Sequence, residues 1–306
     1  MEGKNMTALV SAFSRAYHTK HNDVKIFHDS LAEKIFTEKE YTDISRNMTM
    51  GIKYFNPEFQ GTEEEALRWI VDNQLSPSPL GRAAYTEKSL ENAVNIGAKQ
   101  YLIFAAGYDT FPYRQPDYGK KLEIFEIDYP STSKDKQKRV IAMNKPIPSN
   151  LHYITADFRD SNWHNNLVSC KSFNKDKISF CSLLGISYYL SKEDFVSLIS
   201  KISTLVSEGS SIIFDYPDEN NYKVTAGERA KKQAALAAKS GEKMLGRYSY
   251  GEIEEILSTC GFLIYEHLSP QEITEQYFKE YNDANPKHKM KAFDNVNYSL
   301  AVKKSK

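Results

Sequence analysis

The chain has 306 residues, of which 41% are hydrophobic and 26% charged, a composition typical of a globular protein with a sizeable core. Its 40 basic and 40 acidic residues cancel, so no excess of positive charge indicates a nucleic-acid partner. No apolar run approaches the roughly 20 residues of a membrane span, and no signal peptide is apparent. Three cysteines without metal-ligand spacing predict reduced thiols in a cytoplasmic protein and no metal site.

The first part of the chain is predicted to be helical. Apolar residues recur at helical spacing over residues 7–17 and 24–36. A capping box, in which Thr62 and Glu65 satisfy each other's backbone N–H groups, predicts the start of a further helix. Pro77 and Pro79 are expected to end that helix, and another is predicted from about residue 81 to residue 96. We therefore expect an N-terminal helical cap over residues 1–98.

From residue 100 onwards the pattern changes to alternating strands and helices. Strands are predicted near residues 100–105, 122–127, 151–155, 178–184 and 209–215, and helices near 131–144, 161–169 and 191–206. This alternation is typical of an open parallel sheet in an α/β fold. After residue 248 a helix capped by Ser249, a strand at 262–267, a helix capped by Ser269 and a final strand at 297–303 complete the pattern.

Residues 217–247 interrupt the alternation with a basic, alanine-rich stretch. We interpret this segment as an inserted helix pair, a lid that lies over the site. A solvated surface excursion is the alternative interpretation.

The segment 99–130 contains the strongest indication of a ligand site. A short apolar run ends in the small residues Ala105, Ala106 and Gly107, and a second run, about twenty residues further on, ends in Asp128. A small-residue turn lets a ligand approach the backbone, and a carboxylate at a strand end can accept hydrogen bonds from both hydroxyls of a ribose. An ordinary strand–turn–strand unit with an aspartate at a strand end is the alternative.

The glycine fingerprint of dinucleotide sites, G-x-G-x-x-G, is absent, since its positions are occupied by Ala105, Gly107 and Thr110. This counts against NAD. A nucleoside without a pyrophosphate needs no such glycines, and S-adenosylmethionine is the common ligand of that kind.

Several ordered motifs resemble the leucine carboxyl methyltransferase family. The stretch AAGYDTFPYR at 105–114 resembles that family's G-A-G-x-D-T-R-x-Y-R element, and FEIDYP at 125–130 resembles its F-E-x-D-x-P element. Residues 7–36 are similar to the opening of the family's small bacterial members, and ITADFRD at 154–160 adds a further match. The resemblance implies a class I methyltransferase Rossmann-like sheet of seven strands, the last antiparallel between its neighbours. It also implies a catalytic domain over residues 99–306 that binds S-adenosyl-L-methionine.

The resemblance also implies a role for individual residues in cofactor binding. Gly107 is expected against the methionyl part, Asp128 on the ribose diol and Asp157 on the adenine amino group. Phe158 is expected to pack on the adenine ring. Arg82, in LGRAAY, aligns with an arginine that binds the cofactor's carboxylate through paired hydrogen bonds. Helix capping by the two aspartates and a surface ion pair of Arg82 are the alternatives.

The sequence departs from the family pattern at two positions. Leu184 stands after the fourth predicted strand, where the family commonly has an acidic residue, and Ala105 replaces the first glycine of the turn. Arg114 matches the family's Y-R element and is expected to fix its loop through an ion pair, whereas Arg15 has no assigned role.

These observations predict an S-adenosylmethionine-dependent O-methyltransferase that acts on a small molecule, with a carboxylate as one candidate acceptor. No catalytic residue is assigned, because methyl transfer depends mainly on alignment and an ionised carboxylate needs no general base. Tyr188, Tyr189 and Tyr216 are candidates for the substrate pocket. A binding protein that keeps the cofactor pocket without turnover is one alternative. A short-chain NAD(P) oxidoreductase, suggested by the spacing of Tyr188 and Lys192, is the other.

Overall fold

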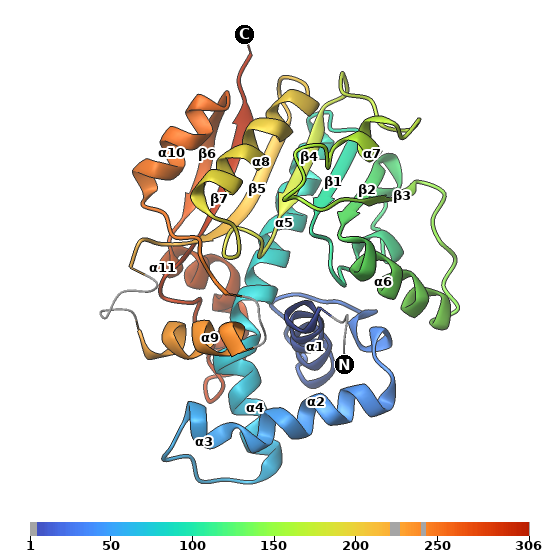
Figure 1. Cartoon of the computed structure of the whole chain (residues 1–306). Helices are drawn as coiled ribbons and strands as arrows, with labels where there is room; N and C mark the ends of the chain where they lie inside the picture. Colours follow the sequence, from blue (N-terminus) through green and yellow to red (C-terminus); the bar gives the residue numbers. More distant parts are fainter. Residues whose placement is uncertain (1–4, 221–226, 240–242, 306) are drawn as a thin grey trace.

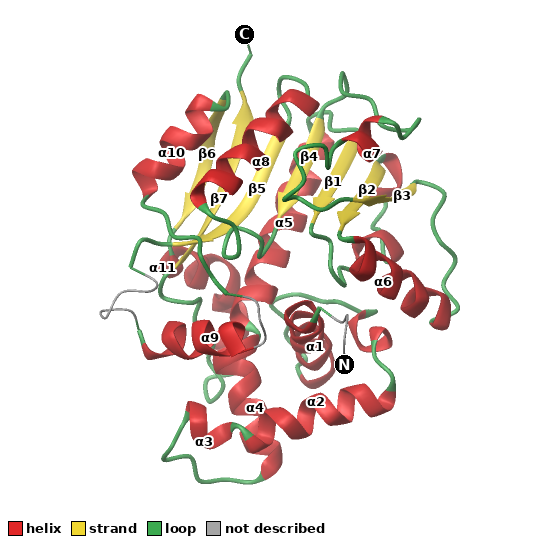
Figure 2. Cartoon of the chain, viewed as in Figure 1, coloured by secondary structure: helices red, strands yellow, loops and turns green. Residues whose placement is uncertain are grey.

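The computed structural model describes residues 5–220, 227–239 and 243–305, and a seven-stranded sheet forms its centre (Figures 1 and 2). The strand order is β3-β2-β1-β4-β5-β7-β6, and β7 runs antiparallel between β5 and β6. This confirms the predicted fold, and every predicted strand is present within two residues of its expected ends. The strands are β1 (Gln100–Phe104), β2 (Glu123–Asp128), β3 (Leu151–Thr155), β4 (Ser179–Leu183), β5 (Ser211–Pro217), β6 (Phe262–Leu268) and β7 (Val296–Lys303).

Both faces of the sheet are covered, because successive side chains of a strand point to opposite sides. Tyr101 and Ile103 of β1 contribute to a core shared with α5 (Pro77–Asn95). Leu102 and Phe104 belong to a second core with α7 (Asn165–Val168), α8 (Lys192–Leu205) and α10 (Tyr250–Thr259). Figure 1 shows α8 and α10 on the face of the sheet nearer the viewer. The predicted division at residue 98 assigns α5 to the cap, although α5 packs against β4 and β5.

The cap helices gather below the sheet in Figure 1, beyond the edge at which β1, β2 and β4 end. They are α1 (Met6–His21), α2 (Glu38–Met50), α3 (Ile52–Phe55) and α4 (Glu63–Ile70), with a π-helical turn over Val71–Leu75. Further helices are α6 (Pro130–Ala142), α11 (Pro270–Ile273) and α12 (Lys279–Ala284). None of the helices in the described residues is long and apolar enough to span a bilayer.

The insertion between β5 and α10 packs on the cap. Its helix α9 (Glu228–Lys239) is held there by Gln233, which donates to the Gln74 carbonyl at 2.6 Å, and by Lys232, which donates to the Phe55 carbonyl at 3.0 Å. The described part of residues 217–247 contains this one helix instead of the predicted pair, while residues 221–226 and 240–242 lie outside the described residues. The two ends of the insertion meet, since Asp218 and Tyr248 form an isolated bridge.

Three helix predictions in this chain are wrong in detail. Residues 24–36 form a loop with a single 3₁₀ turn over Ala32–Ile35, because the Asp29 carboxylate accepts the N–H groups of Leu31 and Ala32 and so stabilises a local turn. Pro77 and Pro79 lie at the start of α5 instead of ending α4. Proline is tolerated there because the backbone N–H groups of a helix's first turn have no partner within the helix, so the N–H that proline lacks is not missed. The helix predicted at 161–169 is reduced to α7.

Asp29 joins three parts of the molecule. Its Oδ2 accepts a hydrogen bond of 2.9 Å from Arg15 Nε of α1, and its Oδ1 accepts one from Thr110 in the loop after β1. Arg15 also donates to the Tyr108 carbonyl at 2.8 Å, and Arg114 pairs with Glu87 of α5. Burial alone would raise the pKa of Asp29, but Arg15, Arg114 and the Thr110 hydroxyl hold it below its usual value. The cap is thereby fixed to the sheet by a buried, ionised carboxylate.

We predict that Asp29→Asn lowers the free energy of unfolding by about 3 kcal/mol or more, because Arg15 then lacks its buried counter-ion. Urea unfolding at neutral pH measures this loss. The pKa of Asp29 is lowered in the folded state, so its stabilisation is present above the ordinary value of 3.8 and is lost as the pH falls below it. The difference between the two proteins should therefore shrink in acid.

Asp23→Asn is the matched control, because Asp23 lies in the same loop and is exposed, and it should change stability by less than about 0.5 kcal/mol. Equal unfolding of Asp29→Asn and the unmodified protein at neutral pH would contradict the role given to this carboxylate.

Candidate functional site

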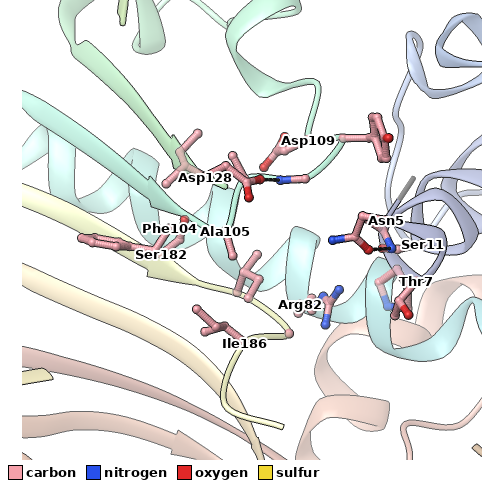
Figure 3. A pocket seen from close by; sticks show the side chains of 18 of the residues that line it. Asn5, Thr7, Ser11, Arg82, Phe104, Ala105, Asp109, Asp128, Ser182 and Ile186 are labelled. Atoms are coloured by element: carbon pink, nitrogen blue, oxygen red, sulfur yellow. Dashed lines mark hydrogen bonds between the residues drawn. The ribbon is translucent and has the colours of Figure 1, made fainter. Parts of the chain in front are cut away.

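A cavity of about 490 Å³ lies beyond the carboxyl ends of the parallel strands. Residues that follow β1, β2, β3 and β4 form one side of it, and α1 and α5 form the other. Figure 3 shows Asn5, Thr7 and Ser11 from the start of α1 facing the strand-end residues Phe104 and Ala105. Open α/β sheets bind their ligands at this edge. The cap therefore forms the wall of the cavity that faces the strand ends.

The turn after β1 has an unusual backbone. Ala105 and Gly107 both have φ of 51°, in the left-handed region that favours glycine. A Cβ atom on Gly107 would lie 3.3 Å from the Ala8 Cβ, so the turn and α1 approach each other closely. Ala105 replaces the family's first glycine yet keeps the left-handed conformation, at a cost of about 1 kcal/mol. All three small residues of the turn line the cavity.

Asp128 ends β2 and lies beside this turn. Its Oδ2 accepts a hydrogen bond of 2.6 Å from the Gly107 N–H, drawn in Figure 3, and its Oδ1 accepts one of 2.6 Å from Tyr129. Burial raises the pKa of Asp128, and these two N–H groups oppose that change. The helix-capping alternative does not apply, because Tyr129 is the N-cap of α6. Each carboxylate oxygen retains a further lone pair, so the two acceptors fit the two hydroxyl donors of a ribose diol.

Asp157 and Phe158 follow β3 and line the same cavity. The Asp157 carboxylate is paired with Arg159 through bonds of 2.9 and 2.7 Å, and the hydrogen bond from that guanidinium lowers its pKa. The Phe158 ring lies 6.0 Å from that of Phe104 and 5.4 Å from that of Trp163, measured between centroids. An aromatic wall beside an ionised carboxylate fits the adenine end of a nucleoside.

Arg82, on α5, forms a buried ion pair. Its Nη1 donates to Asp215 Oδ2 at 3.1 Å, and 18% of its side chain is exposed. Asp215 on β5 is fully buried and also accepts hydrogen bonds of 2.6 Å from the Gly185 N–H and 2.9 Å from the Tyr188 hydroxyl. The alternative of a surface ion pair does not apply. Asp215 is a site residue that the sequence predictions miss, although an aspartate in an apolar strand is a recognisable signal.

Leu184 directly follows β4 and lines the cavity, so the wall is apolar where the family's acidic residue is expected. The nearby carboxylate of Asp215 reaches the next residue, Gly185, from the neighbouring strand. A Cβ atom on Gly185 would lie 2.5 Å from Arg82 Nη1, so the Arg82 side chain occupies the space that this glycine leaves. Arg114 forms the ion pair that the sequence predicts, with Glu87.

A second cavity, of about 510 Å³, adjoins the first. Its walls come from α1, α2, α3, α9 and the residues before β7, and Tyr188 lines it, while Tyr189 lines both cavities. Tyr216 lines neither, because its ring is buried in the core, where its hydroxyl lies 2.9 Å from Nε2 of His267. Among the described residues, no group of three or more His, Cys, Asp or Glu side chains is placed to hold a metal.

Comparison with known proteins identifies the family. The leucine carboxyl methyltransferase model matches residues 8–203. A Bacillus subtilis protein named "Putative S-adenosyl-L-methionine-dependent methyltransferase YktD" is 42% identical over 305 residues, which cover 98% of each chain. Two solved structures share the fold at low identity. A putative methyltransferase from Thermobifida fusca has a TM-score of 0.57 at 14% identity, over 99% of this chain and 97% of its own. A DUF574 family protein from Streptomyces avermitilis has a TM-score of 0.60 at 12% identity, over 96% and 97%.

The matched region contains Arg82, Gly107, Asp128 and Asp157, the residues that the structure brings around one cavity. The match covers well over half of the chain, and the Bacillus subtilis protein aligns along nearly all of it. The chain therefore belongs to the leucine carboxyl methyltransferase family and is an S-adenosyl-L-methionine-dependent methyltransferase.

Proposed function

We propose that this methyltransferase acts on a small molecule and transfers the methyl group to a carboxylate oxygen. The observation that carries this proposal is that the acidic side chains around the two cavities already have hydrogen-bond or ion-pair partners, or lie in solvent. Glu87 is paired with Arg114, Asp157 with Arg159, and Asp128 accepts two backbone N–H groups. Asp109 accepts the Phe111 N–H, and Asp294 is largely exposed beside Arg229.

No histidine is among the described residues that line the two cavities. A phenol or an alcohol needs a positioned base to remove its proton, whereas a carboxylate is already ionised at neutral pH. A site whose acidic groups are already engaged is therefore better suited to a carboxylate acceptor. The volumes of the cavities, about 490 and 510 Å³, support a small molecule as the substrate.

Five residues are proposed to hold the cofactor. Asp128 would bind the ribose, Asp157 and Phe158 the adenine, Gly107 would lie against the methionyl part, and Arg82 would bind the carboxylate. When bound, S-adenosyl-L-methionine supplies an electrophilic methyl group on a sulfonium. The contribution of the protein is then to hold the acceptor oxygen in line with that group, and such alignment supplies on the order of 7–11 kcal/mol.

The chemical stability of the product tests the acceptor group. The purified protein is incubated with S-adenosyl-L-methionine carrying a tritiated methyl group and with a panel of small carboxylic acids and phenols. We expect S-adenosylhomocysteine and a methyl ester, from which alkali releases labelled methanol. Label in an alkali-stable ether would overturn the carboxylate assignment. If the protein binds the cofactor but methylates no compound of the panel, the result would favour the alternative of a protein that keeps the cofactor pocket without turnover.

We predict that Asp128→Ala weakens binding of S-adenosyl-L-methionine at least tenfold, because each hydrogen bond to a charged group contributes about 1.5–3 kcal/mol. Titration calorimetry measures the affinity, circular dichroism checks the fold, and NAD serves as a second titrant that should not bind. Asp160→Ala is the control, since Asp160 is exposed and does not line the cavity. Unchanged affinity in Asp128→Ala would show that the ribose is bound elsewhere.

A further inference from the structure

The second cavity supports an inference that rests on the proposed function and makes its substrate more specific. We propose that this cavity, which we name the acceptor chamber, binds the body of the methyl acceptor, and that the acceptor is a carboxylic acid whose body is apolar. Three observations support this: the side chains that line the chamber, the charges among them, and its junction with the first cavity, in which we propose that the cofactor binds and which we name the cofactor cavity.

The chamber is lined mostly by apolar side chains that come from separate parts of the chain. They include Val10 of α1, Met48 of α2, Phe55 of α3, Leu75 of the π-helical turn, Leu236 of α9 and Val296 of β7. Side chains of this kind offer few hydrogen bonds to a sugar or a polar peptide, and they gain most from removing apolar surface from water. The chamber is therefore suited to a hydrocarbon body.

The charges that line the chamber favour an anion. Arg82 and Arg229 are each 18% exposed in their side chains, whereas the one acidic residue, Asp294, is 70% exposed. Arg229 Nη2 donates to the Ala292 carbonyl at 2.6 Å, and its guanidinium lies 4.3 Å from the centroid of the Phe293 ring. Asp215 offsets the charge of Arg82, so Arg229, which is largely buried while its partner Asp294 is largely solvated, is the cation that attracts an acid and disfavours an amine.

The chamber and the cofactor cavity meet at shared residues. Thr7, Ser11, Pro79, Arg82 and Tyr189 line both. Figure 3 shows Thr7, Ser11 and Arg82 together on one side of the cofactor cavity. Asp215 holds Arg82 at this boundary through their ion pair. An acid whose body fills the chamber therefore presents its carboxylate where the two cavities join, which is where an acceptor oxygen is needed.

The inserted helix α9 forms one wall of the chamber through Ala230, Gln233, Leu236 and Ala237. Because Gln233 is hydrogen-bonded to the Gln74 carbonyl, this wall is fixed to the cap at a defined distance. The structure thus makes α9 the element that limits the size of the acceptor, and a larger side chain on its inner face should shorten the acids that fit.

A series of acids tests the chamber. The rate of S-adenosylhomocysteine formation is measured with acetate, butyrate, octanoate and dodecanoate, and with phenylacetate and 2-naphthoate as the aromatic arm. We expect kcat/KM to rise roughly fourfold for each methylene that is buried, until the chamber is full. A rise with size in either the alkyl or the aromatic series supports an apolar body, and the series with the higher kcat/KM shows whether the acceptor is an alkyl or an aromatic acid. Acetate as good as the larger acids would overturn the proposal.

Ala230→Phe adds bulk to the inner face of α9 and should lower kcat/KM for the largest accepted acid at least tenfold, while the Kd for S-adenosyl-L-methionine stays unchanged. Ala238→Phe is the matched control, since Ala238 lies on the same helix, is exposed and does not line the chamber. Circular dichroism checks both folds. Equal effects of the two variants, or none from Ala230→Phe, would contradict the role of α9.

Calorimetry separates a failure of this inference from a failure of the proposed function. 2-Naphthoate and octanoate are titrated into the protein saturated with S-adenosylhomocysteine, so the readout does not depend on turnover. If the acids bind, Ala230→Phe weakens that binding and no acid is methylated, the role of the chamber would be supported and the proposed reaction contradicted. Turnover of small acids with no dependence on their size would sustain the reaction and contradict the chamber.

Discussion

The arrangement of the site depends on one buried carboxylate. Asp29 lies in a loop between α1 and α2 and accepts hydrogen bonds from α1, from the loop after β1 and from its own turn. A buried charge is stable only when it is fully paired, so these contacts hold each other in place. Because α1 and the loop after β1 both line the cofactor cavity, a residue outside that cavity helps to hold the cap against the strand ends.

Two kinds of interaction then divide the work of binding. The strand ends provide hydrogen-bond acceptors and a small-residue turn, which we propose hold the nucleoside, and Asp128 and Gly107 are bonded to each other. The cap and α9 provide the apolar walls of the acceptor chamber. Arg82 belongs to both, since it extends from α5 to the boundary of the two cavities and is anchored there by Asp215. The separation lets the nucleoside half keep a fixed shape while the other half is adapted to its substrate.

The fold was largely predictable from the sequence, and the site only in part. The strands are recognisable in the sequence because a strand buried on both faces, such as the one with Tyr101–Phe104, is a continuous apolar run, and this run ends at small residues. The helix expected at 24–36 fails because apolar spacing does not reveal that Asp29 will use the backbone N–H groups of its own turn. The partner of Arg82 lies 133 residues further along the chain, a distance over which a single sequence carries no pairing signal. The sequence predicts Tyr216 for the pocket, just after the expected end of a strand, yet β5 continues to Pro217 and the pleat turns the Tyr216 ring into the core.

The closed ends of the insertion have an evolutionary consequence. Asp218 and Tyr248 meet in a bridge, so the chain leaves β5 and returns to α10 at nearly the same point. A segment whose ends are already joined can be lengthened, trimmed or exchanged with little entropic cost to the rest of the protein. Relatives that keep the same sheet and the same strand-end residues can therefore change their substrate through changes in this insertion alone. Antibodies likewise vary their binding loops on a constant framework.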